Sequence, residues 1–297
     1  MAKGYKADIK KDLTPDEYWY IYLTEGLRGV NKHFPFHRRI LANLEPLFFR
    51  LVPTDPRCVS CRAPFRGLGV PVMRAIGRQQ STLNPSICAV CENYALKYKT
   101  KAELDLAILF ADVRGSTKLA ERMKPAEFSQ LINRFFNAST NELVLSGAMV
   151  EKLIGDEVTA FFVPGLAGKH YHRRAVEAAK RVLKATGHNE ASGPWIPVGI
   201  GVHSGESFVG AVGKEGGLSQ ISVLGDTANV ASRLAAAARV GEILLSEEIV
   251  QKAGLETTGL EKRELSLKGK SGSVIAWVLN PVKSPKISSQ NRSGQRE

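Results

Sequence analysis

The 297-residue sequence has no run of about 20 apolar residues, the length that a helix needs to span a membrane. Its first residues, MAKGYKADIKKDLTPDEY, lack the apolar segment of a secretory signal peptide. No internal repeat is present, which argues against a repeat architecture. Cysteine is scarce, with four residues in the whole chain. We therefore expect a soluble, cytoplasmic protein without a structural disulfide framework.

The positive charge is unevenly distributed along the chain. The formal net charge is +12, but residues 101–280 contain 21 Lys and Arg against 20 Asp and Glu. Residues 1–100 contain 16 against 8, and the tail from 281 contains 4 against 1. Because the larger part is nearly neutral, no nucleic-acid partner is expected. The basic N-terminal region leaves a membrane-surface or protein partner open.

Helix and strand signals alternate from about residue 104 onward. LDLAILFADV predicts a buried strand, and Pro125 to about Leu145 and HRRAVEAAKRVLKAT predict helices. EKLIGDEVTAFF, PVGIGVHSGESFVGAVG and ELSLKGKSGSVIAWVL each predict a hairpin. Since hairpins interrupt any regular βαβ order, we expect an α+β fold, a sheet with helices packed on it.

This pattern divides the chain into five parts. They are a helical N-terminal region (1–52), a paired-cysteine segment (53–95), a linker (96–103), an α+β domain (104–280) and a polar tail expected to be disordered (281–297). In the first part, Thr14 and Pro15 predict a helix start. HRRILANLEPLFFRLV predicts a second helix, which either packs on the protein or binds a membrane surface or partner.

The four cysteines form two CxxC pairs, which are Cys58 with Cys61 and Cys88 with Cys91. Two such pairs suit a tetrahedral structural Zn²⁺ site, because each pair offers two thiolates to one ion. The interval of 26 residues between the pairs is longer than the usual spacing. An iron–sulfur or redox role and unliganded thiols therefore remain alternatives.

Polar residues that suit phosphate chemistry follow the predicted strands. Asp112 ends one strand before the turn RGST, and Asp156 lies at the turn of EKLIGDEVTAFF. Two carboxylates on adjacent strands could share a Mg²⁺ ion, although each alone is equally typical of a helix cap or a turn. In GDTANVASRLAAAA, Asp226 is a predicted N-cap, and Asn229 and Arg233 share one helical face.

Five segments in order resemble the class III adenylate/guanylate cyclase catalytic domain. They are FADVRGST, EKLIGDEVTAFF, PVGIGVHSGESFVGAVG, LGDTANVASRLAAAA and LKGKSG, and the resemblance covers about residues 104–280. It implies a ferredoxin-like fold and conversion of ATP into 3′,5′-cyclic AMP and pyrophosphate, in intracellular signalling. It also implies two Mg²⁺ or Mn²⁺ ions per active site.

The resemblance also implies a role for each matching residue. Asp112, Asp156 and the carbonyl of Val113 would bind metal. The other matching residues would bind the substrate. Gly115, Ser116 and Thr117 would hold phosphate. Asn229 would bind the ribose, Arg233 the α-phosphate and Lys268 the terminal phosphates.

The resemblance places purine selection at Lys152 and Ser222. A lysine donates to adenine N1, whereas guanine calls for an acceptor such as carboxylate. Ser222 keeps a hydroxyl for the adenine amine, but it is shorter than the side chains usual there. In the family the metal ligands and the purine-reading residues of one site come from two subunits, so a homodimer is implied. A guanylate or relaxed-specificity cyclase and a nucleotide-sensing regulatory protein remain the alternatives.

Overall fold

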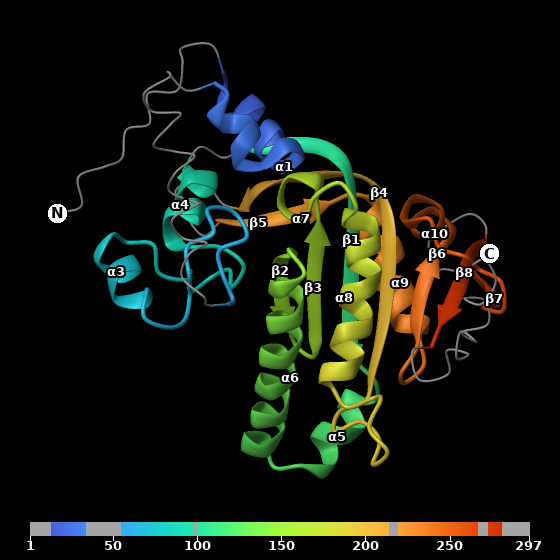
Figure 1. The fold of residues 1–297 in the computed structure, drawn as a ribbon. Helices are drawn as coiled ribbons and strands as arrows, with labels where there is room; N and C mark the ends of the chain where they lie inside the picture. The colour runs from blue at the N-terminus through green and yellow to red at the C-terminus, as the bar shows by residue number, and fades with distance from the viewer. Residues whose placement is uncertain (1–12, 34–54, 98–99, 214–218, 267–272, 281–297) are drawn as a thin grey trace, which may run out of the picture.

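The computed structural model describes residues 13–33, 55–97, 100–213, 219–266 and 273–280. Within these ranges the chain forms one eight-stranded sheet with helices on both faces (Figure 1). The strand order is β2-β3-β1-β4-β6-β8-β7, and β5 pairs with β4 outside this path. The predicted α+β fold is therefore confirmed.

Two antiparallel strand pairings form the centre of the sheet. β1 (Lys101–Val113) pairs antiparallel with β3 (Glu157–Phe162) on one side and with β4 (Val198–Gly213) on the other. β2 (Met149–Ile154) pairs with β3 and forms one edge. The remaining strands are β5 (Ser219–Leu224), β6 (Ile243–Ser246), β7 (Glu261–Ser266) and β8 (Ser273–Leu279). The order β2-β3-β1-β4 is the ferredoxin-like arrangement that the resemblance implied.

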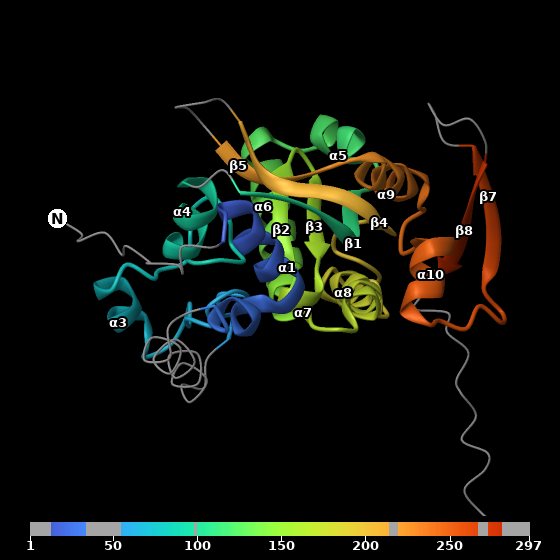
Figure 2. The ribbon, with the colours of Figure 1, turned by 90° about the horizontal axis from the view of Figure 1, so that it is seen from above.

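Helices cover the sheet on both faces, so the middle strand is buried on both sides. α6 (Pro125–Leu145) packs on β2 and β3, and α8 (Tyr171–Ala185) packs on α6, β1 and β3. α9 (Asp226–Ala237) packs on β1 and β4 on the side opposite α8 (Figure 2). The short helices are α5 (Ser116–Arg122), α7 (Pro164–Ala167) and α10 (Glu247–Ala253). All residues from Leu106 to Ala111 are buried, as a strand covered on both faces requires.

The predicted hairpin in PVGIGVHSGESFVGAVG is wrong, because this segment is the single long strand β4. Its pairing with β1 is continuous from Lys101 opposite Gly210 to Val113 opposite Val198. Two glycines of this strand allow close packing. A Cβ on Gly201 would lie 2.3 Å from the Ala235 nitrogen, and one on Gly205 would lie 2.8 Å from the Thr227 hydroxyl. Glycine therefore lets α9 lie directly on the strand.

The described part of the N-terminal region packs on the sheet rather than standing apart from it. α1 (Pro15–Asn31) begins with the predicted Thr14 cap, and the indole nitrogen of Trp19 donates to the Val209 carbonyl at 3.2 Å. α3 (Val70–Ala75) and α4 (Ala89–Lys97) follow in the cysteine segment. Buried residues of all these parts belong to one hydrophobic cluster with β1. Since β1 already begins at Lys101, most of the predicted linker 96–103 is regular structure instead.

Some predictions fall outside the described residues. These are the helix in HRRILANLEPLFFRLV, the tail 281–297 and Lys268. Among the helices that are described, none is both long and apolar enough to cross a membrane.

Candidate active site

An acidic corner forms where β1 ends beside the β2–β3 turn. Asp112 lies directly opposite Glu157 on β3 and opposite Gly199 on β4. The backbone nitrogen of Val113 donates to the Asp156 carbonyl at 3.2 Å, which holds the turn against the strand end. The two aspartates predicted as metal ligands therefore lie at one corner of the sheet, as their motifs suggested.

The electrostatics of this corner disfavour further negative charge. Burial raises the pKa of Asp112, Arg114 opposes that rise, and the charge of Asp156 adds to it. Burial also raises the pKa of Glu157, and the charges of Asp112 and Asp156 raise it further. Three carboxyl groups thus crowd a partly desolvated corner. The positive charge of a divalent cation would offset the repulsion between these carboxylates. Mg²⁺ and similar hard cations bind carboxylate oxygens, so they suit this corner.

Arg114 supplies the positive charge next to Asp112. Its guanidinium forms an ion pair with Asp112 and donates to the Ala236 carbonyl at 2.8 Å. Ala236 lies in the last turn of α9, where helix carbonyls carry partial negative charge. Arg114 therefore links the acidic corner to the end of α9, and a cation that binds Asp112 would compete with this guanidinium.

Lys152 lies beside a buried carboxylate on β2. The pairing of β2 with β3 shifts between Val150 and Lys152, so Glu151 occupies a bulge. The side chain of Glu151 is 2% exposed and forms an ion pair with the Lys152 ammonium at 3.0 Å. It also accepts from the Val223 nitrogen on β5 at 3.1 Å. One carboxylate thus connects the lysine to the strand that carries Ser222.

Ser222 is buried on β5, where its hydroxyl accepts from the Gln220 amide at 3.3 Å. Through Glu151 and Val223, its strand is joined to the strand of Lys152. The two predicted purine-reading positions therefore belong to one hydrogen-bonded unit, although 70 residues separate them in the sequence.

Asn229 and Arg233 lie one turn apart on α9, as predicted, with Asn229 exposed and Arg233 partly buried. The predicted N-cap is corrected: Gly225 occupies that position, and Asp226 is the first helical residue. Gly225 has a φ of 144°, which a side chain at that position would resist. Gly115 similarly precedes α5, with a φ of 69°, and Ser116 and Thr117 form its first turn.

Comparisons with known proteins agree with this geometry. Residues 98–281 match the family model described as the adenylate and guanylate cyclase catalytic domain. The chain belongs to this family. An adenylate cyclase from Anabaena cylindrica is 28% identical over an alignment of 191 positions, which covers 58% of this chain and 36% of that protein. The chain therefore spans much less than the full length of this relative.

Solved structures support the same fold. The adenylyl cyclase CyaB from P. aeruginosa is 26% identical, with a TM-score of 0.52. The match covers 60% of this chain and 95% of the CyaB chain. The guanylyl cyclase Cya2 is 23% identical, with a TM-score of 0.55, and the match covers 60% of this chain and 92% of the Cya2 chain. Both nucleotide specificities thus occur among similar structures, so the cyclase fold alone does not assign the purine.

The sequence did not single out three residues that the structure places at the candidate site, namely Glu157, Arg114 and Glu151. Glu157 had a usable signal, because a two-residue turn after Ile154 fixes the register and places the next residue beside the end of β1. Arg114 and Glu151 had none, since each acts through a contact with a distant element, at Ala236 and Val223 respectively.

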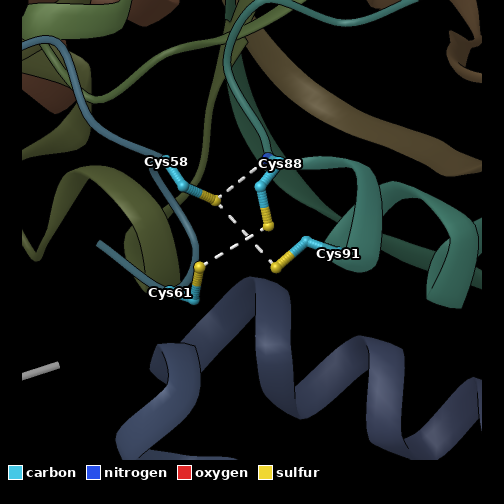
Figure 3. A group of neighbouring side chains, drawn as sticks. All are labelled: Cys58, Cys61, Cys88 and Cys91. Carbon is cyan, nitrogen blue, oxygen red and sulfur yellow. Dashed lines mark hydrogen bonds between the residues drawn. The ribbon is translucent and has the colours of Figure 1, made fainter. Parts of the chain in front are cut away.

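The four cysteines also converge, as their paired spacing predicted. Their sulfur atoms all lie within 4.8 Å of one another, and Figure 3 shows the two pairs facing each other. No pair forms a disulfide. This cluster belongs to the segment before the cyclase domain.

Proposed function

We propose that the chain is an adenylate cyclase that acts as a homodimer. The 3′-hydroxyl of ATP attacks the α-phosphorus, and the bond from this phosphorus to the oxygen bridging to the β-phosphate breaks. The hydroxyl proton passes to solvent, and cyclic AMP and pyrophosphate leave. The observation that carries this proposal is a lysine, Lys152, in the same hairpin as the acidic corner of a cyclase domain.

Asp112, Asp156 and the Val113 carbonyl are the proposed ligands of two Mg²⁺ or Mn²⁺ ions. Such ions activate the attacking hydroxyl and neutralise the triphosphate. The crowding of Asp112, Asp156 and Glu157 supports a cation site, because their mutual repulsion needs a compensating charge. In the metal-bound enzyme, Arg114 would release Asp112 and keep its bond to α9.

The remaining substrate contacts are proposed from the positions of the matching residues. The backbone of Gly115, Ser116 and Thr117 would face phosphate oxygens. Asn229 would orient the ribose, and Arg233, one turn further along α9, would stabilise charge on the α-phosphate. Lys268 is proposed to hold the terminal phosphates, and it lies outside the described residues.

ATP is the proposed substrate because of the side chains around Lys152. Its ammonium has three N–H donors, and Glu151 accepts at 3.0 Å, which leaves donors for adenine N1. Glu151 is itself the kind of acceptor that guanine would need. However, its side chain is only 2% exposed, so its carboxylate is not accessible to a purine.

A homodimer is proposed because the surface near these residues is apolar. Leu153, Ile154 and Leu224 are 40%, 62% and 48% exposed, and they lie at the ends of the strands β2 and β5, which carry Lys152 and Ser222. Large apolar side chains that remain exposed next to a site indicate an interaction surface. A symmetric partner would bury them and complete two equivalent sites.

Purified protein with Mn²⁺ or Mg²⁺ tests the reaction and the substrate. We expect cyclic AMP to form, with kcat/KM for ATP at least about tenfold above that for GTP. The variant Lys152→Glu should reverse this ratio, while Lys169→Glu, an exposed exchange between α7 and α8, should not. A preference of the wild type for GTP would instead make it a guanylate cyclase. A stable dimer without turnover would instead favour a nucleotide-sensing protein.

Mixing two inactive variants tests the shared site. Asp112→Ala removes a metal ligand, and Arg233→Ala removes a phosphate contact that is proposed to serve the partner's metals. In a mixed dimer one site has lost both residues and the other is intact. Random exchange should therefore restore about a quarter of wild-type activity. Restoration near zero, with exchange verified by mass spectrometry, would contradict the shared site.

A further inference from the structure

The four cysteine sulfurs have the spacing of ligands around a single ion. The Sγ atoms of Cys58 and Cys91 lie 3.9 Å apart, and those of Cys61 and Cys88 lie 3.7 Å apart (Figure 3). Four thiolates at the usual Zn–S distance in a tetrahedron are separated by about 3.8 Å. An iron–sulfur cluster distributes its thiolates over separate iron atoms and so needs wider spacing. A disulfide would bring two sulfurs to about 2.05 Å.

The surroundings of the cluster suit a closed structural metal site. Cys58, Cys61 and Cys88 are buried, and no ligand position is left for substrate because four protein atoms fill a tetrahedron. The Ser60 hydroxyl donates to the Cys91 sulfur at 3.1 Å, and the Cys88 nitrogen donates to the Cys58 sulfur at 3.3 Å. Such donors offset the charge of bound thiolates.

The chain just before Cys88 forms a self-bonded turn, residues 81–86, which we call the clamp turn. The Ser81 hydroxyl accepts from the Leu83 and Asn84 nitrogens and donates to Glu92 of α4. The Asn84 side-chain oxygen accepts from the Ser86 nitrogen at 3.0 Å. The Ser86 carbonyl in turn accepts from the Val59 nitrogen, between the first two cysteines. Both CxxC pairs therefore hold the clamp turn in place.

The clamp turn binds the free edge of β2 at one residue. The Asn84 amide donates to the Val150 carbonyl at 2.7 Å, and the Val150 nitrogen donates to the Ser86 hydroxyl at 2.8 Å. All three residues are buried. Val150 directly precedes the bulged Glu151, whose carboxylate holds Lys152. The cysteine cluster is thus connected to the lysine by an unbroken series of bonds.

We propose that the four cysteines bind one Zn²⁺, and that this site positions Lys152 through the clamp turn. The ion would link the two loops that carry the cysteines, and so it would hold the turn rigid. Asn84 and Ser86 then hold Val150, which fixes the bulge and the carboxylate that orients the lysine. They are positioning residues, and this second step rests on the proposed role of Lys152 in reading adenine.

Metal analysis of the purified full chain tests the first step. We expect one zinc per chain, and the Co²⁺-substituted protein should show thiolate-to-cobalt charge transfer and a tetrahedral visible spectrum. Folded protein without metal, or with iron in its place, would overturn the zinc assignment. These readouts do not depend on cyclase activity, so they stand even if the proposed reaction is wrong.

The variant Asn84→Asp tests the second step while keeping the cysteines intact. Aspartate keeps the acceptor for the Ser86 nitrogen but cannot donate to the Val150 carbonyl. We expect unchanged zinc content, faster hydrogen exchange at the Val150 amide, and an ATP-over-GTP ratio about five- to tenfold lower. The matched control is Gln80→Ala, which removes a bond to the Pro85 carbonyl in the same loop without touching β2.

Two outcomes would overturn the positioning role. One is unchanged Val150 exchange in Asn84→Asp, which would show that the clamp turn does not hold the strand. The other is faster exchange with an unchanged nucleotide ratio, which would show that the strand is held for stability alone. If the wild-type protein shows no cyclase activity although its Val150 amide is protected from exchange, the proposed reaction is contradicted and the positioning role is not. Failure of the proposed function and failure of the positioning role are therefore distinguishable.

Discussion

β1 carries two half-buried aspartates, Asp105 in its first half and Asp112 near its end, and the surroundings of the two side chains shift their pKa values in opposite directions. Asp105 accepts from the Tyr171 hydroxyl at 2.7 Å, lies 3.0 Å from a His172 ring nitrogen and pairs with Lys252. These partners outweigh burial and hold its pKa well below the usual range. At Asp112 burial prevails over the single pairing with Arg114, and the pKa is raised.

The difference shows how partners separate a structural carboxylate from a functional one. Asp105 has its charge satisfied within the fold, by groups from α8 and α10. Asp112 lies near the like charge of Asp156, and its counter-charge is the guanidinium of Arg114, which a metal ion can replace. Residue type and strand are the same for both, so only the neighbours distinguish them. Unsatisfied charge of this kind marks functional sites.

The largest expected effect is the loss of activity in Asp112→Asn. A neutral amide oxygen lacks the negative charge with which a carboxylate holds a divalent cation, so cyclase activity should fall by about 1000-fold or more. Thermal unfolding of the metal-free variant should stay within a few degrees of wild type, because a repelled charge has been removed. Enzyme assays and calorimetry check the two parts. Activity above one tenth of wild type would contradict a metal role.

Asp105→Asn should show the reverse pattern. The variant loses charge-assisted bonds to His172 and Lys252, so it should be destabilised by about 1–3 kcal/mol. Activity per folded molecule should change less than about threefold, because Asp105 lies in the first half of the strand, away from the acidic corner. Urea unfolding with parallel assays measures both. A large loss of kcat in folded protein would break the contrast between the two aspartates.

The pH dependence of that destabilisation follows from the lowered pKa of Asp105. The folded state favours the charged carboxylate, so its stabilisation is present above the unfolded pKa of about 4. It is lost as the pH falls below that value toward the folded pKa. The difference in unfolding free energy between wild type and Asp105→Asn should therefore be constant from about pH 7 to 5 and shrink below 4. A constant difference down to the acid limit would contradict a charge effect.

The smallest expected effect concerns Arg114→Gln. Without the guanidinium, Asp112 is free to bind metal, so the Mg²⁺ concentration for half-maximal activity should fall about two- to fivefold. The lost bond to the Ala236 carbonyl should lower stability by about 1 kcal/mol. Metal titrations of activity measure the shift, with Arg122→Gln, on the neighbouring helix α5, as the control. A higher Mg²⁺ requirement would indicate that Arg114 supports the metal instead.

Sequence patterns predicted those parts of the molecule that depend on neighbours in the chain. Pro125 and Leu145 bound α6 as expected, and Asp156 lies at the predicted turn. The long strand β4 was misjudged because Gly205 is typical of a turn, whereas here it makes room for Thr227 of α9. The contacts of Glu151 could not be predicted from the sequence, since its bulge in β2 and its hydrogen bond to β5 depend on how distant strands pair.

The covered edge of β2 has a consequence for solubility. An edge strand with unpaired backbone groups invites pairing with the same strand of another molecule, which is a common route to aggregation. The clamp turn occupies Val150 on that edge with Asn84 and Ser86. A chain in which this segment is unfolded would expose the edge, so under the proposed zinc binding aggregation during expression should increase when zinc is limiting.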